Sequence, residues 1–191
     1  MAVILGTSVD DTLAGGNGND SIYGGRGSDR LTGEAGSDAL VGSYGNDILE
    51  GGDGNDTLIG AGRIDQYTGA VSRGAGEIDI LTGGARTDTF VFSGGSARGG
   101  GGPSYRFNGN SDYALITDFN KSEDIISLAL VEFSGSSSTT VEYSLGASPE
   151  GSPAGTGIYV NNLGTQPDLI AILQNVSPDS VSLSDSYFKI S

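Results

Sequence analysis

Aspartate recurs at a strict spacing of nine residues in the first third of this sequence. The series comprises Asp11, Asp20, Asp29, Asp38, Asp47, Asp56 and Asp65. Carboxylates are hard oxygen ligands that suit Ca²⁺, whereas Mg²⁺ usually keeps several of its own waters. A regular series of carboxylates therefore predicts cation binding, provided that the fold brings the aspartates together.

Each aspartate has the same kinds of neighbours. An apolar or aromatic residue follows two positions later, at Leu13, Ile22, Leu31, Leu40, Leu49, Leu58 and Tyr67. A glycine precedes it by five positions, at Gly6, Gly15, Gly24, Gly33, Gly42, Gly51 and Gly60. After five inserted residues, 69–73, two more units carry Asp79 and Asp88. The chain thus contains nine units of the form G-G-x-G-x-D-x-U-x, with U apolar, and disorder would not require this regularity.

The pattern also predicts the elements that position the aspartates. The six glycine-rich residues of a unit can form a tight turn, because glycine tolerates positive φ. The other three residues can form a short strand whose central side chain points inward. Two units then make a coil of 18 residues, so that Asp20 stacks on Asp38 at one edge and Asp29 on Asp47 at the other. Each stacked pair, with turn carbonyls, would form a cage of oxygen atoms suited to Ca²⁺.

The unit resembles the nonapeptide repeat of the RTX (repeats-in-toxin) calcium-binding family, also called haemolysin-type, over residues 6–91. This resemblance implies an all-β fold, with a right-handed parallel β-roll of two nonapeptides per coil over residues 1–92. It further implies that each ion lies between turns 18 residues apart. The earlier turn supplies the carbonyls of its second and fourth positions, the later turn those of its first and third, and both supply their aspartates.

Transferred to this chain, the resemblance implies an ion between Gly16, Gly18 and Asp20 on one side and Gly33, Ala35 and Asp38 on the other. The implied ligands in the turns are Gly16, Gly18, Gly24, Gly25, Arg26, Gly27, Gly33, Glu34, Ala35, Gly36, Gly42, Ser43, Tyr44, Gly45, Gly51, Gly52, Asp53, Gly54, Gly60 and Gly62, together with the nine repeat aspartates. Nine units allow seven such pairings, and therefore up to about seven Ca²⁺ ions. Arg63, Glu77 and Arg86 replace glycine at the fourth position, where a positive φ is costly, so we expect weaker or different binding there.

Composition excludes several other functions. The net charge of −15 disfavours nucleic acid and anionic membrane surfaces, and the absence of His and Cys removes the usual ligands of zinc, haem and iron–sulfur clusters. An EF-hand counted from Asp53 fails, because Leu58 and Ile64 stand where glycine and glutamate are required. The periodic aspartates are better explained as metal ligands than as catalytic carboxylates, so we predict that the protein is not an enzyme. Without metal their mutual repulsion should keep the chain largely unfolded.

The composition changes after the repeats. Residues 93–112 are rich in glycine and serine and predict a flexible loop. Residues 113–191 predict about six short strands in a small β-sheet or sandwich cap, with 168–173 either a strand or a helical turn. The stretch 115–128 resembles the segment that closes the roll in secreted RTX proteases and cyanobacterial RTX proteins. This likeness implies core positions for Ile116 and Phe119 and turn or edge positions for Asp118 and Asp124.

The family resemblance also implies a role outside the cell. The N-terminus lacks the features of a cleaved signal peptide, and no segment is long and apolar enough to span a bilayer. RTX proteins carry a C-terminal signal for type I secretion, which residues 184–191 loosely fit, so we expect a secreted or cell-surface protein that folds on meeting calcium. Met1, directly before the first unit, favours a complete small protein. Two alternatives remain: a module that binds carbohydrate or a polysaccharide surface, and the export module of a larger hydrolase.

Overall fold

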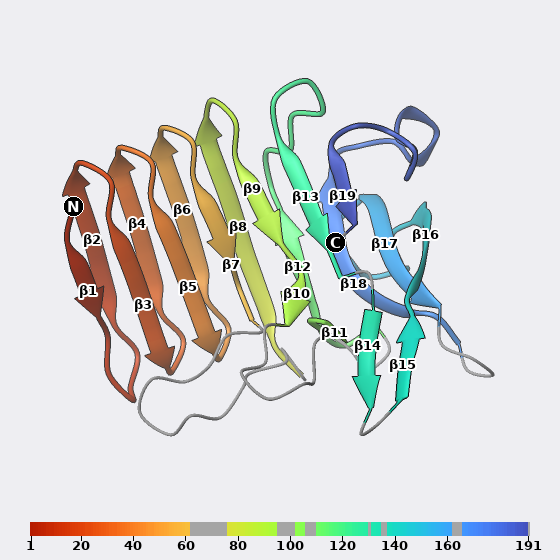
Figure 1. The fold of residues 1–191 in the computed structure, drawn as a ribbon, viewed down its shortest axis with the longest axis horizontal. Coiled ribbons are helices and arrows are strands. Elements are labelled where there is room, and N and C mark those ends of the chain that lie inside the picture. Colours follow the sequence, from red (N-terminus) through yellow and green to blue (C-terminus); the bar gives the residue numbers. More distant parts are fainter. Residues whose placement is uncertain are drawn as a thin grey trace.

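The computed structural model describes residues 1–61, 76–94, 102–105, 110–129, 131–134, 137–161 and 166–190. In these residues the protein consists almost entirely of β-strands, which form two long layers along the molecule (Figure 1). A single-turn 3₁₀ helix, η1 (Pro178–Ser180), lies near the C-terminus. Among the residues that the structure describes, no helix is long and apolar enough to cross a bilayer.

The first layer, sheet 1, has the strand order β1-β3-β5-β7-β9-β13-β19. Its strands are β1 (Val3–Leu5), β3 (Ser21–Arg26), β5 (Ala39–Tyr44), β7 (Thr57–Ile59), β9 (Thr89–Val91), β13 (Ile125–Leu128) and β19 (Phe188–Ile190). All of its strand pairs are parallel. This arrangement is that of a β-roll seen along one face.

The second layer, sheet 2, has the order β2-β4-β6-β8-β12-β18-β17-β16. Its strands are β2 (Thr12–Asn17), β4 (Arg30–Ala35), β6 (Ile48–Asp53), β8 (Ile78–Ala85), β12 (Tyr113–Ile116), β18 (Asp168–Gln174), β17 (Gly155–Asn161) and β16 (Glu142–Ala147). Two small hairpins pair β10 (Ser93–Gly94) with β11 (Gly102–Pro103) and β14 (Val131–Ser134) with β15 (Ser137–Thr140).

The predicted coil of two units is confirmed by the strand register. Leu13 pairs with Leu31 in sheet 2, and Ile22 pairs with Leu40 in sheet 1, in each case 18 residues along the chain. The inward residues form one fully buried column between the sheets: Ile22, Leu31, Leu40, Leu49, Leu58, Leu81 and Phe90. Each buried aliphatic side chain contributes on the order of 1.5–3 kcal/mol, so the column is the main apolar support of the coils.

The register changes once, between β6 and β8. Leu49 pairs with Leu81, and the backbone of Asp47 bonds to Asp79, 32 residues later instead of 18. Treating Asp65 as a regular unit would place it one coil after Asp47, but the structure places Asp79 there. Asp65 and Gly62, both predicted ligands, lie in residues 62–75, outside the described part of the chain. Gly60 and Asp79 lie close together, because a Cβ added to Gly60 would meet Asp79 Oδ2.

The C-terminal residues extend the two sheets of the roll. Strand β12 pairs in parallel with β8, and β13 with β9, so the first strands after the repeats continue both layers. Strands β18, β17 and β16 then complete sheet 2, with the last two pairs antiparallel. The prediction of strands in this region is confirmed, and residues 168–173 belong to a strand, β18, but the strands continue the two sheets of the roll where a separate small sheet or sandwich was expected. Ile116 and Phe119 are buried, as the sequence likeness implied.

Candidate metal centre

The aspartates lie in turns along the two long edges of the roll. Turns from sheet 1 to sheet 2 carry Asp11, Asp29, Asp47 and Asp79, and we call this side the first edge. Turns from sheet 2 to sheet 1 carry Asp20, Asp38, Asp56 and Asp88, and we call this side the second edge. All of these aspartates except Asp11 are buried. The fold thus brings together aspartates one coil apart, as the spacing predicted.

One oxygen of each aspartate joins neighbouring coils. The Asp29 N–H donates to Oδ1 of Asp47 at 2.8 Å, and the Asp38 N–H donates to Oδ1 of Asp56 at 2.8 Å. The same bond links every consecutive pair on both edges. These hydrogen bonds to a charged acceptor are stronger than neutral ones. The sequence analysis did not predict this structural role of Oδ1.

The second oxygen has a different environment. Oδ2 of Asp29, Asp38, Asp47, Asp56 and Asp88 is buried and has no hydrogen-bond partner in the described structure. Burial raises the pKa of Asp47 to about 8, with the charge of Asp79 adding to the effect, and it raises the pKa of Asp88 to about 7. An unpaired buried carboxylate oxygen is strongly destabilising. A proton or a cation would stabilise each of these five atoms.

Each Oδ2 lies close to the first-position glycine of its own turn. A Cβ atom added to Gly15 would lie 3.2 Å from Asp20 Oδ2 and 2.8 Å from the carbonyl oxygen of Gly33. A Cβ added to Gly51 would lie 2.5 Å from both Asp56 Oδ2 and the carbonyl oxygen of Gly83. The absence of a side chain at this glycine therefore lets an aspartate oxygen of its own turn and a first-position carbonyl of the next turn approach it closely. Both belong to the ligand types that the resemblance implies.

The second- and fourth-position carbonyls face the following turn on the same edge. A Cβ added to Gly36 would meet the carbonyl of Gly18, and one added to Gly52 would meet that of Glu34. Both positions adopt positive φ, and the residues involved are Gly16, Gly18, Gly25, Gly27, Glu34, Gly36, Ser43, Gly45, Gly52, Gly54, Gly84 and Arg86. The implied carbonyl ligands therefore lie in the gap between stacked turns.

Three of these residues are not glycine. Glu34, Ser43 and Arg86 have φ values of 74°, 88° and 89°. A non-glycine residue in this region costs about 1 kcal/mol or more, so the turn geometry is maintained against local strain. At Arg86 the turn forms in spite of the side chain that we expected to disfavour it. In the preceding turn Gly76, and not Glu77, has the positive φ, of 77°.

The third-position carbonyls make one hydrogen bond across the same gap. The Gly18 N–H donates to the Ala35 carbonyl at 2.7 Å, and the Gly36 N–H donates to the Asp53 carbonyl at 2.8 Å. A carbonyl has two lone pairs, so each oxygen keeps capacity for a second partner. The side chains at two other third positions, Arg26 and Tyr44, contact each other, with the guanidinium carbon 5.4 Å from the ring centroid. Their contribution to a site would therefore come from the backbone alone.

The donor set fits calcium. No three His, Cys, Asp or Glu side chains converge in the part of the chain that the structure describes, so each site would depend on two aspartates and on backbone carbonyls. A pair of stacked turns offers up to six oxygen atoms. Ca²⁺ takes six to eight oxygen ligands, and water can supply the remaining ones. Calcium would supply the positive charge that the unpaired Oδ2 atoms lack.

The turns also contain contacts that the sequence analysis did not predict, two of them made by Asp118 and Asp124, which it had placed in turns or at an edge. On the second edge Asp88 donates its N–H to Asp124 Oδ1 at 3.1 Å, so the turn after β12 continues the aspartate series. Asp118 in that turn accepts the N–H groups of Gly83 and Gly84 at 3.0 and 2.8 Å. On the first edge Asp79 Oδ2 accepts the hydroxyl of Tyr105. Tyr105 and Ser104 are fully buried, although their segment was expected to be a flexible loop.

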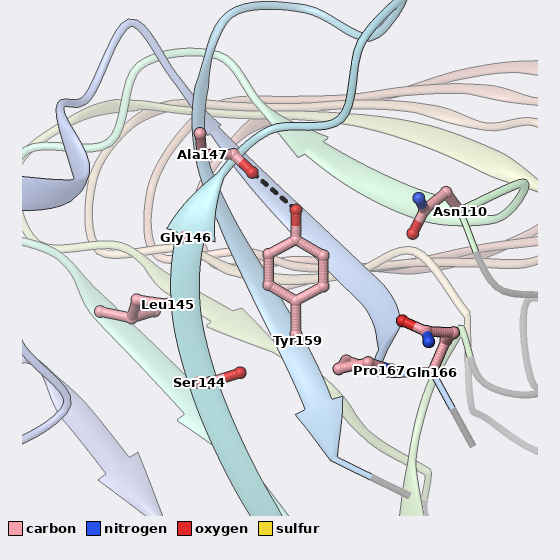
Figure 2. A pocket seen from close by; sticks show the side chains of 8 residues that line it. All are labelled: Asn110, Ser144, Leu145, Gly146, Ala147, Tyr159, Gln166 and Pro167. Carbon is pink, nitrogen blue, oxygen red and sulfur yellow. Dashed lines mark hydrogen bonds between the residues drawn. The ribbon is translucent and has the colours of Figure 1, made fainter.

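A pocket of about 500 Å³ lies on the outer face of β16 and β17. The ring of Tyr159 lies across this face, and its hydroxyl donates to the Ala147 carbonyl at 2.7 Å (Figure 2). The ring covers Gly157, where an added Cβ would lie 2.6 Å from a ring carbon. The amide side chains of Asn110 and Gln166 face the ring from the opposite wall (Figure 2). All the residues that line this pocket are uncharged.

A family model and a solved structure are similar to this chain. A family model described as the RTX calcium-binding nonapeptide repeat, in four copies, matches residues 5–40 and 32–66. Among solved structures, the solution structure of the AlgE6R3 subunit of a mannuronan C5-epimerase from Azotobacter vinelandii is similar, with 23% sequence identity and a TM-score of 0.43. That match covers 97% of this chain and 80% of the other. Among curated proteins, none matches this sequence.

Proposed function

We propose that this chain, whose residues 5–66 match the RTX calcium-binding nonapeptide repeat, is a non-catalytic module whose β-roll folds when calcium binds. The observation that carries the proposal is the set of five buried aspartate Oδ2 atoms without a hydrogen-bond partner. Calcium would neutralise these atoms and would join each turn to the next turn on its edge.

The residues around each ion follow from the stacked turns. On the first edge, one ion would be held by the Gly25 and Gly27 carbonyls and Asp29 from one turn. The Gly42 and Tyr44 carbonyls and Asp47, from the next turn on this edge, would complete the coordination of this ion. On the second edge, Glu34, Gly36 and Asp38 would act with Gly51, Asp53 and Asp56. The number of bound ions depends on how many such pairs are complete.

Charge explains why metal should control folding. The chain has 24 acidic and 9 basic residues, and its stacked carboxylates would repel each other without a cation. The column of inward side chains contributes one buried residue per turn, which is a thin core for the cost of ordering nine residues. Metal-binding energy is then also folding energy, as in other small metal-dependent domains.

A secreted role follows from this metal dependence. Extracellular calcium modules bind with dissociation constants of roughly 10⁻⁴–10⁻³ M, so their sites stay largely empty where free calcium is scarce. A chain left unfolded by its own charge could pass through a type I secretion channel and fold outside the cell. Expression with and without a type I exporter, followed by assay of the culture medium, tests export separately from calcium binding.

The direct test measures stability as calcium is titrated. We expect the melting temperature of the β signal in far-ultraviolet circular dichroism to rise steeply with millimolar Ca²⁺ and only weakly with Mg²⁺. Asp47→Asn should lower the calcium response strongly, because Asp47 borders two stacked pairs. Asp10→Asn is the matched control, since it removes the same charge from an exposed position of the roll. Equal responses in the two variants would contradict the assigned role of Asp47.

One observation favours a second function, the binding of a neutral carbohydrate. The Tyr159 ring, held flat against glycine and faced by two amide side chains, offers an aromatic surface beside hydrogen-bonding groups without charge. Screening against neutral and acidic oligosaccharides tests this function. Binding that is lost in Tyr159→Ala and retained in Tyr159→Phe would support it, whereas no binding in the calcium-loaded protein would refute it.

A further inference from the structure

On the first edge, the hydrogen bonding of the aspartate side chains at the two ends differs from that in the interior. In the interior, Oδ2 of Asp29 and Oδ2 of Asp47 have no hydrogen-bond partner. At the ends, Oδ2 of Asp11 and Oδ2 of Asp79 each accept a side-chain hydroxyl. Oδ2 therefore has no hydrogen-bond partner in the interior of this row of aspartates, and it accepts a side-chain hydroxyl at each end.

At the N-terminal end the hydroxyl belongs to Thr7. Its Oγ1 donates to Asp11 Oδ2 at 2.8 Å, and its backbone N–H donates to the same oxygen at 2.6 Å. Thr7 occupies the second position of the first turn, where the later turns have a residue with positive φ, and Thr7 does not adopt that conformation. The first turn therefore closes on its own aspartate.

At the C-terminal end the hydroxyl belongs to Tyr105. The residues between β9 and β12, 92–112, lack the nonapeptide pattern. A Cβ added to Gly60 would meet both the Tyr105 hydroxyl and Asp79 Oδ2. In an interior turn the corresponding space beside Gly24 faces the Gly42 carbonyl, 2.9 Å from an added Cβ. The tyrosine hydroxyl thus lies beside Asp79 Oδ2 at the end of the row, where no further nonapeptide turn follows on this edge.

Tyr105 is held in this place by its surroundings. Its side chain is fully buried, and its ring packs against Phe92 with 6.3 Å between the ring centroids. The adjacent Ser104 donates its hydroxyl to the Ala61 carbonyl at 3.0 Å and its N–H to the Phe92 carbonyl at 3.0 Å. The hydroxyl therefore approaches Asp79 from a fixed direction.

We infer that the hydroxyls of Thr7 and Tyr105 replace calcium ions at the two ends of the first edge and so limit the number of ions bound there. This inference rests on the proposed calcium-binding function. A donated O–H supplies positive charge to Oδ2, and its hydrogen atom lies where a cation would have to approach that oxygen. The second edge differs, because its last repeat aspartate, Asp88, keeps an unpaired Oδ2.

The test counts bound calcium after equilibrium dialysis of the full chain, by elemental analysis of the protein. Tyr105→Phe and Thr7→Val each remove one hydroxyl and keep most of the side-chain shape. We expect each variant to bind one calcium ion more than the wild type, and the double variant two more. Matched controls are Tyr159→Phe, whose hydroxyl bonds to Ala147, and Thr57→Val in strand β7, and both should keep the wild-type number.

The outcomes separate the inference from the proposed function. An unchanged number in both variants would overturn the inference, because the hydroxyls would then have only a structural role. One ion fewer in Tyr105→Phe would also overturn it, because the hydroxyl would then be a calcium ligand. If Tyr105→Phe does not fold, Thr7→Val at the exposed N-terminal end decides alone. A wild type that binds no calcium would instead refute the proposed function.

Discussion

The space beside each first-position glycine leads to a quantitative prediction for Gly51→Ala. Gly51 does not have a positive φ, so alanine fits its backbone conformation and the effect must come from space alone. The added Cβ would lie 2.5 Å from Asp56 Oδ2 and 2.5 Å from the Gly83 carbonyl oxygen, where contacts below about 3.0 Å force a shift. Both oxygens border the gap between the turns of Asp56 and Asp88. The methyl group should therefore displace two ligands of one calcium site at once.

The magnitude follows from overpacking and from the lost ion. Forcing a methyl group into a filled space costs about 1–3 kcal/mol. Loss of an ion present at ten times its dissociation constant removes a further ~1.4 kcal/mol by mass action. We thus expect the free energy of unfolding at millimolar Ca²⁺ to fall by about 2–4 kcal/mol, with one fewer bound ion.

The assay is chemical denaturation in saturating calcium, combined with calcium counting. Gly146→Ala is the matched control, because its Cβ would meet nothing nearer than a ring carbon of Tyr159 at 3.5 Å and its φ is not positive. It should change stability by less than about 0.5 kcal/mol. If Gly51→Ala were as stable as the control and bound as many ions, the assigned space would not be part of a metal site.

Three further predictions concern protons, strain and metal choice. Without calcium, the pKa in the folded state is about 8 for Asp47 and about 7 for Asp79 and Asp88, above the ordinary 3.8. The folded state therefore binds more protons than the unfolded state at pH values between 3.8 and these pKa values. The fraction of folded protein in a chelator, measured by circular dichroism, should therefore rise as the pH falls from 7.5 to 5, and a fall would contradict the assigned burial. Arg86→Gly should raise the free energy of unfolding by about 1 kcal/mol in denaturant titration, because glycine relieves a φ of 89°, and a loss of stability would refute this. Mg²⁺ at the same concentration as Ca²⁺ should leave the circular dichroism spectrum near that of the chelated protein, since Mg²⁺ dehydrates reluctantly, and full folding in Mg²⁺ would contradict the all-protein oxygen sites.

Much of the roll could be predicted from the sequence because its period determines its geometry. The spacing of nine places aspartates one coil apart and directs every second strand residue inward, and the pairing of Leu31 with Leu49 confirms this. The first-position glycines could also be assigned to tight turns. The double role of each aspartate could not, because spacing does not show that Oδ1 bonds to the previous coil while Oδ2 stays free.

The errors in position arose where sequence patterns compete. Asp65 and Asp79 both fit the repeat, and only the strand register shows that Leu81 continues the inward column after Leu49. Tyr105 was missed because it lies in a glycine-rich segment that predicts a loop, and its contact with Asp79 joins residues 26 positions apart. Such contacts depend on tertiary packing, which local composition does not encode.

The central claim is that calcium in the turns determines the fold, and an amide-resolved NMR spectrum tests it most directly. In a chelator at neutral pH, we predict that the amide signals of the repeat aspartates collapse into the range of unfolded chains. With millimolar Ca²⁺ these signals should disperse, and the N–H groups of Asp29 and Asp38 should become protected from hydrogen exchange. A dispersed and protected spectrum in the chelator, unchanged by calcium, would contradict the account.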